Sequence, residues 1–264
     1  MQILPAATYL GDSLTTRRAN GILTSVTSYS EVNLPNVSLH AHENAHVTTL
    51  LAGATLEKRQ RSECYRQAGQ AVFFHAGEPH QNSNTLPGSR NFNIEFTTDF
   101  FQTYHLDPSD IAGAVSNNPL AALVFVNAYR ESLHNDPMAN DSVAMAILSL
   151  LDTRTNAGNR PPKWVGQVTE LLHDRWNEQV GLEELSKETG VHSVTISKHF
   201  RRYFACSLSE YMRKLKVLNA LSLIKNTSNQ LTHIAYEAGF ADQSHFTRVF
   251  KEVTGFLPKQ YRNV

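Results

Sequence analysis

The chain has 264 residues, 41% of them hydrophobic, and its 24 basic side chains balance its 24 acidic ones. This length can form one large domain or two ordinary ones, and the composition excludes a disordered chain. The longest unbroken apolar run, residues 120–126, is far shorter than the roughly 20 residues of a membrane-spanning helix, so we expect no membrane partner. The first residues lack the charged region and long apolar core of a secretory signal, which predicts a cytoplasmic location. Two cysteines, Cys64 and Cys206, are too few for a disulfide framework or a cysteine-rich zinc site.

The first part of the chain has the pattern of a β domain. Short β-prone runs at residues 46–51, 71–75 and 91–96 are separated by turn residues. Several short strands with this spacing predict an antiparallel barrel or sandwich.

Histidines are concentrated in the same part of the chain. Five of the twelve lie between positions 40 and 80, namely His40, His42, His46, His75 and His80. Residues 40 and 42 of one strand point to the same face, so their imidazoles can converge inside a barrel with His80 from a neighbouring strand. Imidazole is a suitable ligand for first-row transition metals, and it titrates near neutral pH.

The spacing of these histidines resembles the two cupin motifs. The first motif is similar to His40-Ala-His42, three residues, His46, six residues and Gly53. The second is similar to Gly69, five residues, His75, one residue, Gly77-Glu-Pro-His80, three residues and Asn84. The chain departs from these motifs at Leu34, His46 and His75, where glycine, glutamate and proline are expected.

The resemblance implies a cupin-like β-barrel. In metal-binding cupins these positions hold iron, nickel, manganese or zinc, so a divalent metal on four histidines is one expectation. A pocket for a small effector, lined partly by the histidines and without metal, is the second. A third alternative is that residues 77–80 only shape a turn.

Two helices are predicted after the β domain, near residues 119–134 and 142–153. Their apolar faces can pack on the barrel or against a second protomer, and both alternatives stay open. The polar, proline-containing segment NAGNRPP, residues 156–162, then predicts a linker.

The zero net charge is the sum of two unequal parts. Residues 1–160 carry 10 basic and 14 acidic groups, whereas residues 161–264 carry 14 basic and 10 acidic groups. Within residues 196–216, six basic side chains stand against Glu210 alone. A local excess of this kind can attract a polyanion, and a solvated helix face is the alternative.

The basic part contains a duplicated unit. Residues 182–191, LEELSKETGV, align with residues 231–240, LTHIAYEAGF, at an offset of 49 residues. The match continues at an offset of 50, pairing Phe200 with Phe250 and Tyr211 with Tyr261. Each copy predicts a short helix, a tight turn at Gly190 or Gly239 and a second helix, with Ser193 and Asp242 as the N-caps of the second helices.

This is the helix-turn-helix design, in which the second helix enters the major groove of DNA. The side chains that suit base edges are Val194, Ser197 and Lys198 in the first copy and Gln243, Ser244, Thr247 and Arg248 in the second. Four basic residues are placed for phosphates: Arg201, Arg202, Lys214 and Lys251. An amphipathic helix predicted over residues 208–225 spans about 27 Å, comparable to one turn of DNA at about 34 Å, so one chain can present two reading helices. A bundle in which these helices merely pack together is the alternative.

Residues 163–264 resemble the DNA-binding domain of the AraC/XylS transcription regulators. The resemblance is carried by LEELSKETGV, by ISKHFRRYF and by HIAYEAGFADQSHFTRVFKEVTGFLPKQYR. The chain departs from the family at Ala205, Lys216 and Leu257, where glycine, arginine and serine are usual. In this family the first domain is commonly a cupin-like sensor without metal, and the region before the linker often mediates dimerisation.

The resemblance therefore implies an α+β chain. Residues 1–155 would form a cupin-like sensor and dimerisation domain with linker helices, and residues 163–264 an all-α DNA-binding domain with two helix-turn-helix motifs. The expected function is a sequence-specific transcription regulator, not an enzyme, controlled by a small effector. The expected partners are double-stranded DNA, a second protomer and, for an activator, RNA polymerase. The alternatives are a metal-dependent cupin enzyme with an accessory helical domain and a protein-interaction module.

Overall fold

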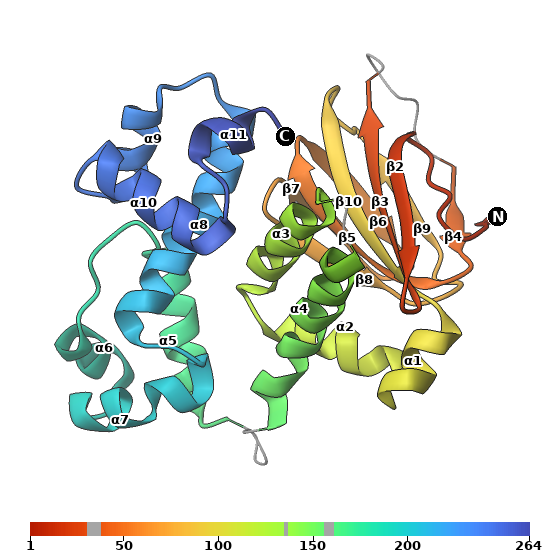
Figure 1. The fold of residues 1–264 in the computed structure, drawn as a ribbon. Helices are drawn as coiled ribbons and strands as arrows, with labels where there is room; N and C mark the ends of the chain where they lie inside the picture. Colours follow the sequence, from red (N-terminus) through yellow and green to blue (C-terminus); the bar gives the residue numbers. More distant parts are fainter. Residues whose placement is uncertain (31–37, 135–136, 156–160) are drawn as a thin grey trace. The chain divides into compact units, whose positions relative to one another are not determined.

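The computed structural model describes residues 1–30, 38–134, 137–155 and 161–264. These residues form two compact units, one consisting mainly of Met1–Leu150 and the other of Leu151–Ile224 and Ser228–Asn263 (Figure 1). The first unit holds the strands together with helices and the second is all-helical, which confirms the predicted α+β class. Residues 156–160, most of the predicted linker, lie outside the described part of the chain, as does Leu34 of the first cupin motif.

The strands of the first unit form two five-stranded sheets. The first sheet has the order β1 (Gln2–Leu4), β4 (His40–His42), β9 (His80–Ser83), β6 (Ala54–Arg59) and β7 (Glu63–Gln67). The second has the order β2 (Asp12–Ala19), β3 (Ile22–Tyr29), β10 (Ser89–Phe96), β5 (Ala45–Ala52) and β8 (Ala71–Phe74). Strand β1 runs parallel to β4, and the other described strand pairs are antiparallel. Two such sheets make the cupin-like β domain that the motifs predict.

Strand β10 shows where the apolar core of this unit lies. Phe92, Ile94 and Phe96 are buried on one face of the strand, and Asn91 and Asn93 are buried on the other. The aromatic face packs against helices, because Phe92 meets the ring of Tyr129 at 5.3 Å. The amide face points between the sheets, where Asn93 bonds to hydroxyl groups of β3 and β5. The apolar core therefore lies between the second sheet and the helices, and the space between the sheets is polar.

Four helices follow the strands, and the first three of them contact the second sheet (Figure 1). They are α1 (Thr98–Tyr104), α2 (Pro108–Asn117), α3 (Ala121–Ser132) and α4 (Pro137–Thr155). Helix α2 begins at a proline and has Asp107 as its N-cap, whose carboxylate accepts from the Ser109 N–H at 2.8 Å. Among the described residues no single helix is long and apolar enough to cross a membrane, and α2 with α3 would be so only as a pair bent by 113°.

The second unit contains the predicted duplication. Helices α6 (Leu182–Thr189) and α7 (Ser193–Phe204) form the first copy, and α9 (Leu231–Glu237) and α10 (Gln243–Thr254) form the second. The remaining helices of this unit are α5 (Lys163–Asp174), α8 (Leu208–Asn226) and α11 (Pro258–Arg262). Gly190 ends α6 in the left-handed conformation at φ 69°, as predicted.

The caps of the two second helices differ. Asp242 caps α10 as predicted, and its carboxylate accepts from the His245 N–H at 2.7 Å. The Ser193 cap is wrong, because the helix already includes Ser193 and His192 Nδ1 accepts from the Val194 N–H at 3.3 Å. An imidazole nitrogen satisfies the same orphan N–H as a hydroxyl oxygen, so the sequence pattern for hydroxyl caps placed the start one residue late.

Candidate functional site

The outer faces of α7 and α10 carry the predicted base-reading residues. Ile196 and Phe200 of α7, and Phe246 and Phe250 of α10, are buried and turn the opposite faces outward. Six of the seven predicted residues are exposed: Val194, Ser197, Lys198, Gln243, Ser244 and Arg248. Thr247 is half-buried. The predicted base-reading side chains of both α7 and α10 are therefore accessible from outside the domain.

Two of these side chains have informative surroundings. Val194 is an apolar residue that is 64% exposed at the first turn of α7, where its methyl groups can reach a thymine methyl. The Gln243 amide oxygen accepts a hydrogen bond from the Thr232 hydroxyl of α9, which orients the amide at the start of α10.

The predicted phosphate contacts are not equivalent. Arg201, Arg202 and Lys251 are exposed. Lys214 instead forms an ion pair with Glu210 at 2.7 Å, and this bond lowers the pKa of the Glu210 carboxyl. The charge of Lys214 is thus already matched within its own helix.

A concave surface lies between the two reading helices. Its volume is about 940 Å³, and its lining includes Ser197 and Arg201 of α7, Arg213 of α8 and His245 of α10. Sequence reasoning did not single out Arg213 or His245 for this role, because the placement depends on how three helices meet.

Lys216 is part of the wall of this surface and is largely buried. Its Nζ donates to the backbone carbonyl of Gly239 at 2.7 Å and lies 5.9 Å from the centre of the Phe240 ring. Burial lowers the pKa of this amine. One side chain of the central helix thus supports the turn of the second helix-turn-helix unit.

The first unit contains the other candidate site, a cluster of four buried histidines. His40 and His42 come from β4, His46 from β5 and His80 from β9, and each side chain is at most 3% exposed. The β4–β9 pairing places His40 opposite His80, with ring centres 4.3 Å apart. The ring of His42 lies 5.3 Å from His40 and 5.4 Å from His80.

Three of the four histidines converge on one point. One ring nitrogen from each of His40, His42 and His80 lies within 4.8 Å of the other two. His46 does not belong to this group of nitrogens, although its ring lies 4.3 Å from that of His42 and stacks on Phe74 at 4.8 Å. The four-histidine site expected from the sequence is therefore a group of three with a fourth histidine next to it.

Backbone carbonyl groups fix the protonation of two of these rings. His40 Nδ1 lies 2.9 Å from the carbonyl oxygen of Ser38, and His80 Nδ1 lies 3.0 Å from that of Glu78. A carbonyl oxygen only accepts, so each Nδ1 carries the proton and each Nε2 keeps its lone pair. This is the second-shell arrangement that orients histidine ligands of metals.

Burial keeps the cluster neutral. It lowers the pKa of His42 to about 3, helped by the neighbouring His80 and His40, and the pKa of His80 to about 4. The pKa values of His40 and of His46 are also lowered by burial. At neutral pH the rings are therefore free bases.

The cavity that these rings line is small. Its volume is about 30 Å³, counted as space open to the centre of a water-sized sphere. A single water needs roughly 10–15 Å³ on this measure, so the cavity holds about two water molecules. Its wall also includes Tyr9, whose ring lies 4.9 Å from that of His42, and Glu57.

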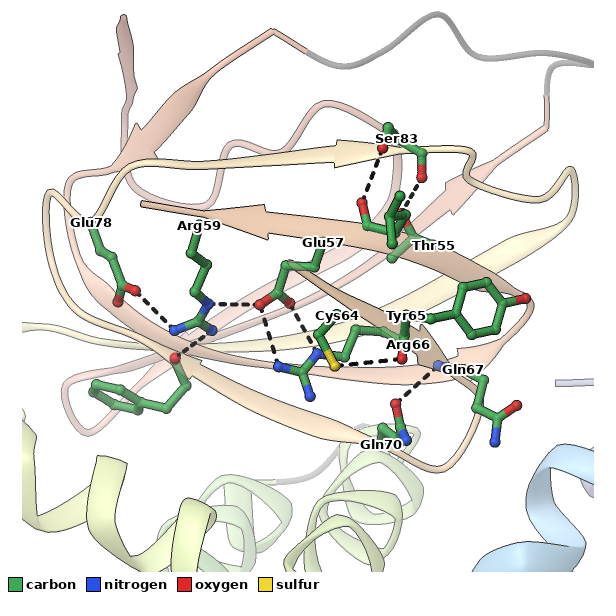
Figure 2. Close-up of polar contacts among 12 residues, drawn as sticks. Thr55, Glu57, Arg59, Cys64, Tyr65, Arg66, Gln67, Gln70, Glu78 and Ser83 are labelled. Atoms are coloured by element: carbon green, nitrogen blue, oxygen red, sulfur yellow. Dashed lines mark hydrogen bonds and ion pairs between the residues drawn. The ribbon is translucent and has the colours of Figure 1, made fainter. Parts of the chain in front are cut away.

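Two arginines form ion pairs with the carboxylate of Glu57 (Figure 2). Arg59 Nε donates to Glu57 at 2.6 Å, and Arg66 lies 3.4 Å from its second oxygen. Arg59 also pairs with Glu78 at 2.9 Å and lies over the Phe74 ring at 4.2 Å. These bonds hold the segment before His80 against β6.

The fifth predicted histidine, His75, does not join the cluster. It is exposed in the loop after β8, where its ring contacts Phe73 at 5.0 Å. Sequence reasoning also missed Tyr9, Glu57 and Arg59, which no motif marks because strand pairing alone brings them beside the histidines.

The comparisons with known proteins concern mainly the second unit. Residues 185–263 match the family model described as "Helix-turn-helix domain". The chain is 30% identical over 105 residues to the HTH-type transcriptional regulator GbdR of Pseudomonas aeruginosa, covering 40% of this chain and 28% of that protein. It is 26% identical over 120 residues to the HTH-type transcriptional activator RhaS of Escherichia fergusonii, covering 46% of this chain and 42% of that protein. The chain thus spans less than half the length of these curated relatives.

Solved structures are similar at a lower level. ToxT from Vibrio cholerae shares 11% identity with a TM-score of 0.39, covering 92% of this chain and 98% of that chain. An AraC-type regulator from Chromobacterium violaceum shares 20% identity with a TM-score of 0.37, covering 38% of this chain and 89% of that chain. The duplicated helices, their exposed faces and the matched family model together identify residues 185–263 of the second unit as a helix-turn-helix domain.

Proposed function

We propose that this chain is a sequence-specific DNA-binding transcription regulator whose N-terminal barrel responds to a small effector. The observation that carries the proposal is the pair of helices α7 and α10. Each buries an aromatic face in its domain and exposes a face of donor, acceptor and methyl groups within a domain of the AraC type. A single chain with two such helices can read two segments of the major groove.

The exposed positions take two roles in this proposal. Base contacts come from Val194, Ser197 and Lys198 on α7 and from Gln243, Ser244, Thr247 and Arg248 on α10. Phosphate contacts come from Arg201, Arg202 and Lys251, with Lys214 contributing after it exchanges Glu210 for a phosphate. Arginine and lysine donate to guanine, and glutamine pairs with adenine, which supports the assignment.

We place the effector site at the histidine cluster of the barrel. The space between the sheets buries imidazole, amide and carboxylate groups, although apolar side chains would fill it at a lower desolvation cost. A bound ligand that interacts with these polar groups would offset the cost of burying them.

A metal-dependent cupin enzyme with an accessory helical domain is the alternative function. A cavity with room for about two water molecules favours sensing, because an organic substrate of ordinary size needs several hundred Å³. The curated relatives above are named as transcription regulators, which also supports a regulator over an enzyme.

The remaining partners follow from the regulatory role. We propose that the protein acts in the cytoplasm, where the DNA that it reads lies. A homodimer through α3 and α4 would bind paired half-sites, and an activator would in addition contact RNA polymerase.

The experiment that tests this function is selection of bound fragments from sheared genomic DNA with the full-length chain, followed by footprinting. Arg248→Ala should weaken binding to the selected site about 5- to 150-fold, equivalent to about 1–3 kcal/mol, and leave binding to random DNA unchanged. Arg61→Ala, which removes an exposed arginine of the barrel unit, is the matched control and should change neither. Failure to select any fragment, or an unchanged Arg248→Ala footprint and affinity, would contradict the proposal.

A further inference from the structure

The barrel cavity limits what the effector can be. A volume of about 30 Å³ cannot accept a sugar, an aromatic acid or a nucleotide. It can accept a single ion with one water. The effector that fits this interior is therefore of atomic size.

The chemistry of the cavity wall selects a cation that binds nitrogen. His40 and His80 make their described hydrogen bonds through Nδ1, which leaves each Nε2 lone pair available. His42 Nδ1 is buried and has no hydrogen-bond partner among the described residues. A buried nitrogen without a partner is unfavourable in the folded chain, and coordination to a metal would remove the cost.

The carboxylates near the cavity are not available as ligands. Both oxygens of Glu57 already face arginines, at 2.6 Å from Arg59 and 3.4 Å from Arg66. A neutral set of three nitrogens suits first-row transition metals and binds magnesium and calcium poorly, because the latter prefer oxygen ligands.

The separation of the ring nitrogens is close to that of a bound state. Nitrogens that share one zinc ion at about 2.1 Å lie roughly 3.4 Å apart in a tetrahedron. The three histidine nitrogens lie within 4.8 Å of one another, so each pair must approach by about 1.4 Å at most. Rotation of the imidazole rings can close this distance, and His40 and His80 can offer Nε2 because Nδ1 of each is bonded to a backbone carbonyl oxygen.

We propose that the effector of this regulator is a first-row divalent transition metal ion, bound by His40, His42 and His80 with its fourth position open to the cavity. The inference rests on the proposed function, because it names the ligand of the same sensing site. Binding draws β4 and β9 together, and these strands carry all three ligands. His46 is not one of the three ligands, and its ring lies 4.3 Å from that of His42 and 4.8 Å from that of Phe74.

The first part of the test measures metal binding by the full-length chain, stripped with a chelator and titrated with Zn²⁺ or Ni²⁺ alone. We expect one equivalent per chain, and no binding of Mg²⁺ at the same concentration. His40→Gln and His80→Gln should each lower the affinity at least 100-fold. His75→Gln is the matched control, since it removes a histidine of the same motif that lies outside the cluster, and it should bind as the unsubstituted chain does.

Folding of the variants is checked by thermal unfolding without metal. If a glutamine variant fails to fold, His80→Phe is used in its place, because phenylalanine keeps a ring of similar volume and has no ligand nitrogen. Sub-stoichiometric binding by the unsubstituted chain would overturn the proposal. So would one equivalent retained in a folded His40→Gln or His80 variant, which would place the ion at other histidines.

The second part measures coupling between metal and DNA. Affinity for the selected DNA site should change at least fivefold between the metal-free and the Zn²⁺- or Ni²⁺-loaded chain, and this change should vanish in His80→Gln. One equivalent of metal without any change in DNA affinity would overturn the role as effector. DNA binding that is absent in both forms would overturn the proposed function itself, so the two failures are distinguishable.

Discussion

Lys216 Nζ donates to the backbone carbonyl of Gly239 at 2.7 Å and so connects the middle of α8 to the turn between α9 and α10. The same turn accepts a second support, because Asn177 Nδ2 donates to the carbonyl of Glu237 at 3.3 Å. Two side chains from outside α9 and α10 therefore support the turn that precedes the second reading helix.

Replacing Lys216 by methionine should destabilise the second domain by about 1–3 kcal/mol, because the partly buried carbonyl of Gly239 loses its charged donor. Lys216→Arg keeps a donor and should retain most of the stability. Urea unfolding followed by the fluorescence of Trp164 and Trp176 measures the difference. Lys214→Met, which breaks the partly exposed ion pair with Glu210, is the comparison and should cost no more than about 1 kcal/mol.

The two turn glycines of the duplication should respond differently to alanine. Both have positive φ, 69° at Gly190 and 72° at Gly239. A Cβ on Gly239 would lie 1.8 Å from the Asn177 carbonyl oxygen, whereas one on Gly190 would meet nothing within 4 Å. Gly190→Ala should thus cost about 1–2 kcal/mol for the left-handed backbone, and Gly239→Ala clearly more. Equal losses in urea unfolding would show that the backbone conformation alone matters.

Acid should destabilise the barrel when metal is absent. The pKa values of His42 and His80, about 3 and about 4, lie below the value of 6.5 for an unperturbed histidine, so the unfolded chain binds more protons. The contribution of the neutral histidines to the free energy of unfolding is fully present above pH 6.5. It is lost progressively as the pH falls from 6.5 to about 4. Each such histidine contributes about 1.4 kcal/mol per pH unit within that range.

Hydrogen exchange of β4, β5 and β9 with chelator present measures this loss. His80→Phe should flatten the dependence, since it removes one titrating group. Protection that stays constant between pH 7.5 and 5 would show that the histidines are already exposed to solvent.

Arg201→Ala should weaken specific and nonspecific DNA binding alike, because Arg201 is assigned to a phosphate. The slope of log affinity against log salt should become shallower by about one unit. Lys214→Ala should change the slope less, since Glu210 already pairs with Lys214. A loss restricted to the selected DNA site would instead place Arg201 at a base.

Local pattern in the sequence was sufficient for the helix-turn-helix domain. The helical period of Ile196 and Phe200, repeated at Phe246 and Phe250, predicted which faces are buried and which are exposed, and the structure confirms both. Such a pattern is readable because contacts within a helix-turn-helix unit join residues that are near in sequence. The helix N-caps were harder to predict, because several kinds of side chain can accept a hydrogen bond from the same backbone N–H, as His192 does at α7.

Tertiary structure alone decided the composition and size of the barrel site. The sequence pointed to five histidines as candidate site residues. Only the pairing of β4 with β9, and the position of His75 in the loop after β8, decided that His75 lies outside the cluster. The carboxylate of Glu57, neutralised by two arginines, and the small cavity follow from packing between two sheets whose strands are far apart in sequence. The net charge and the length of the chain did not determine the composition or the size of this site. Charge and length are sums over the whole chain, whereas a site depends on which distant side chains the fold brings together.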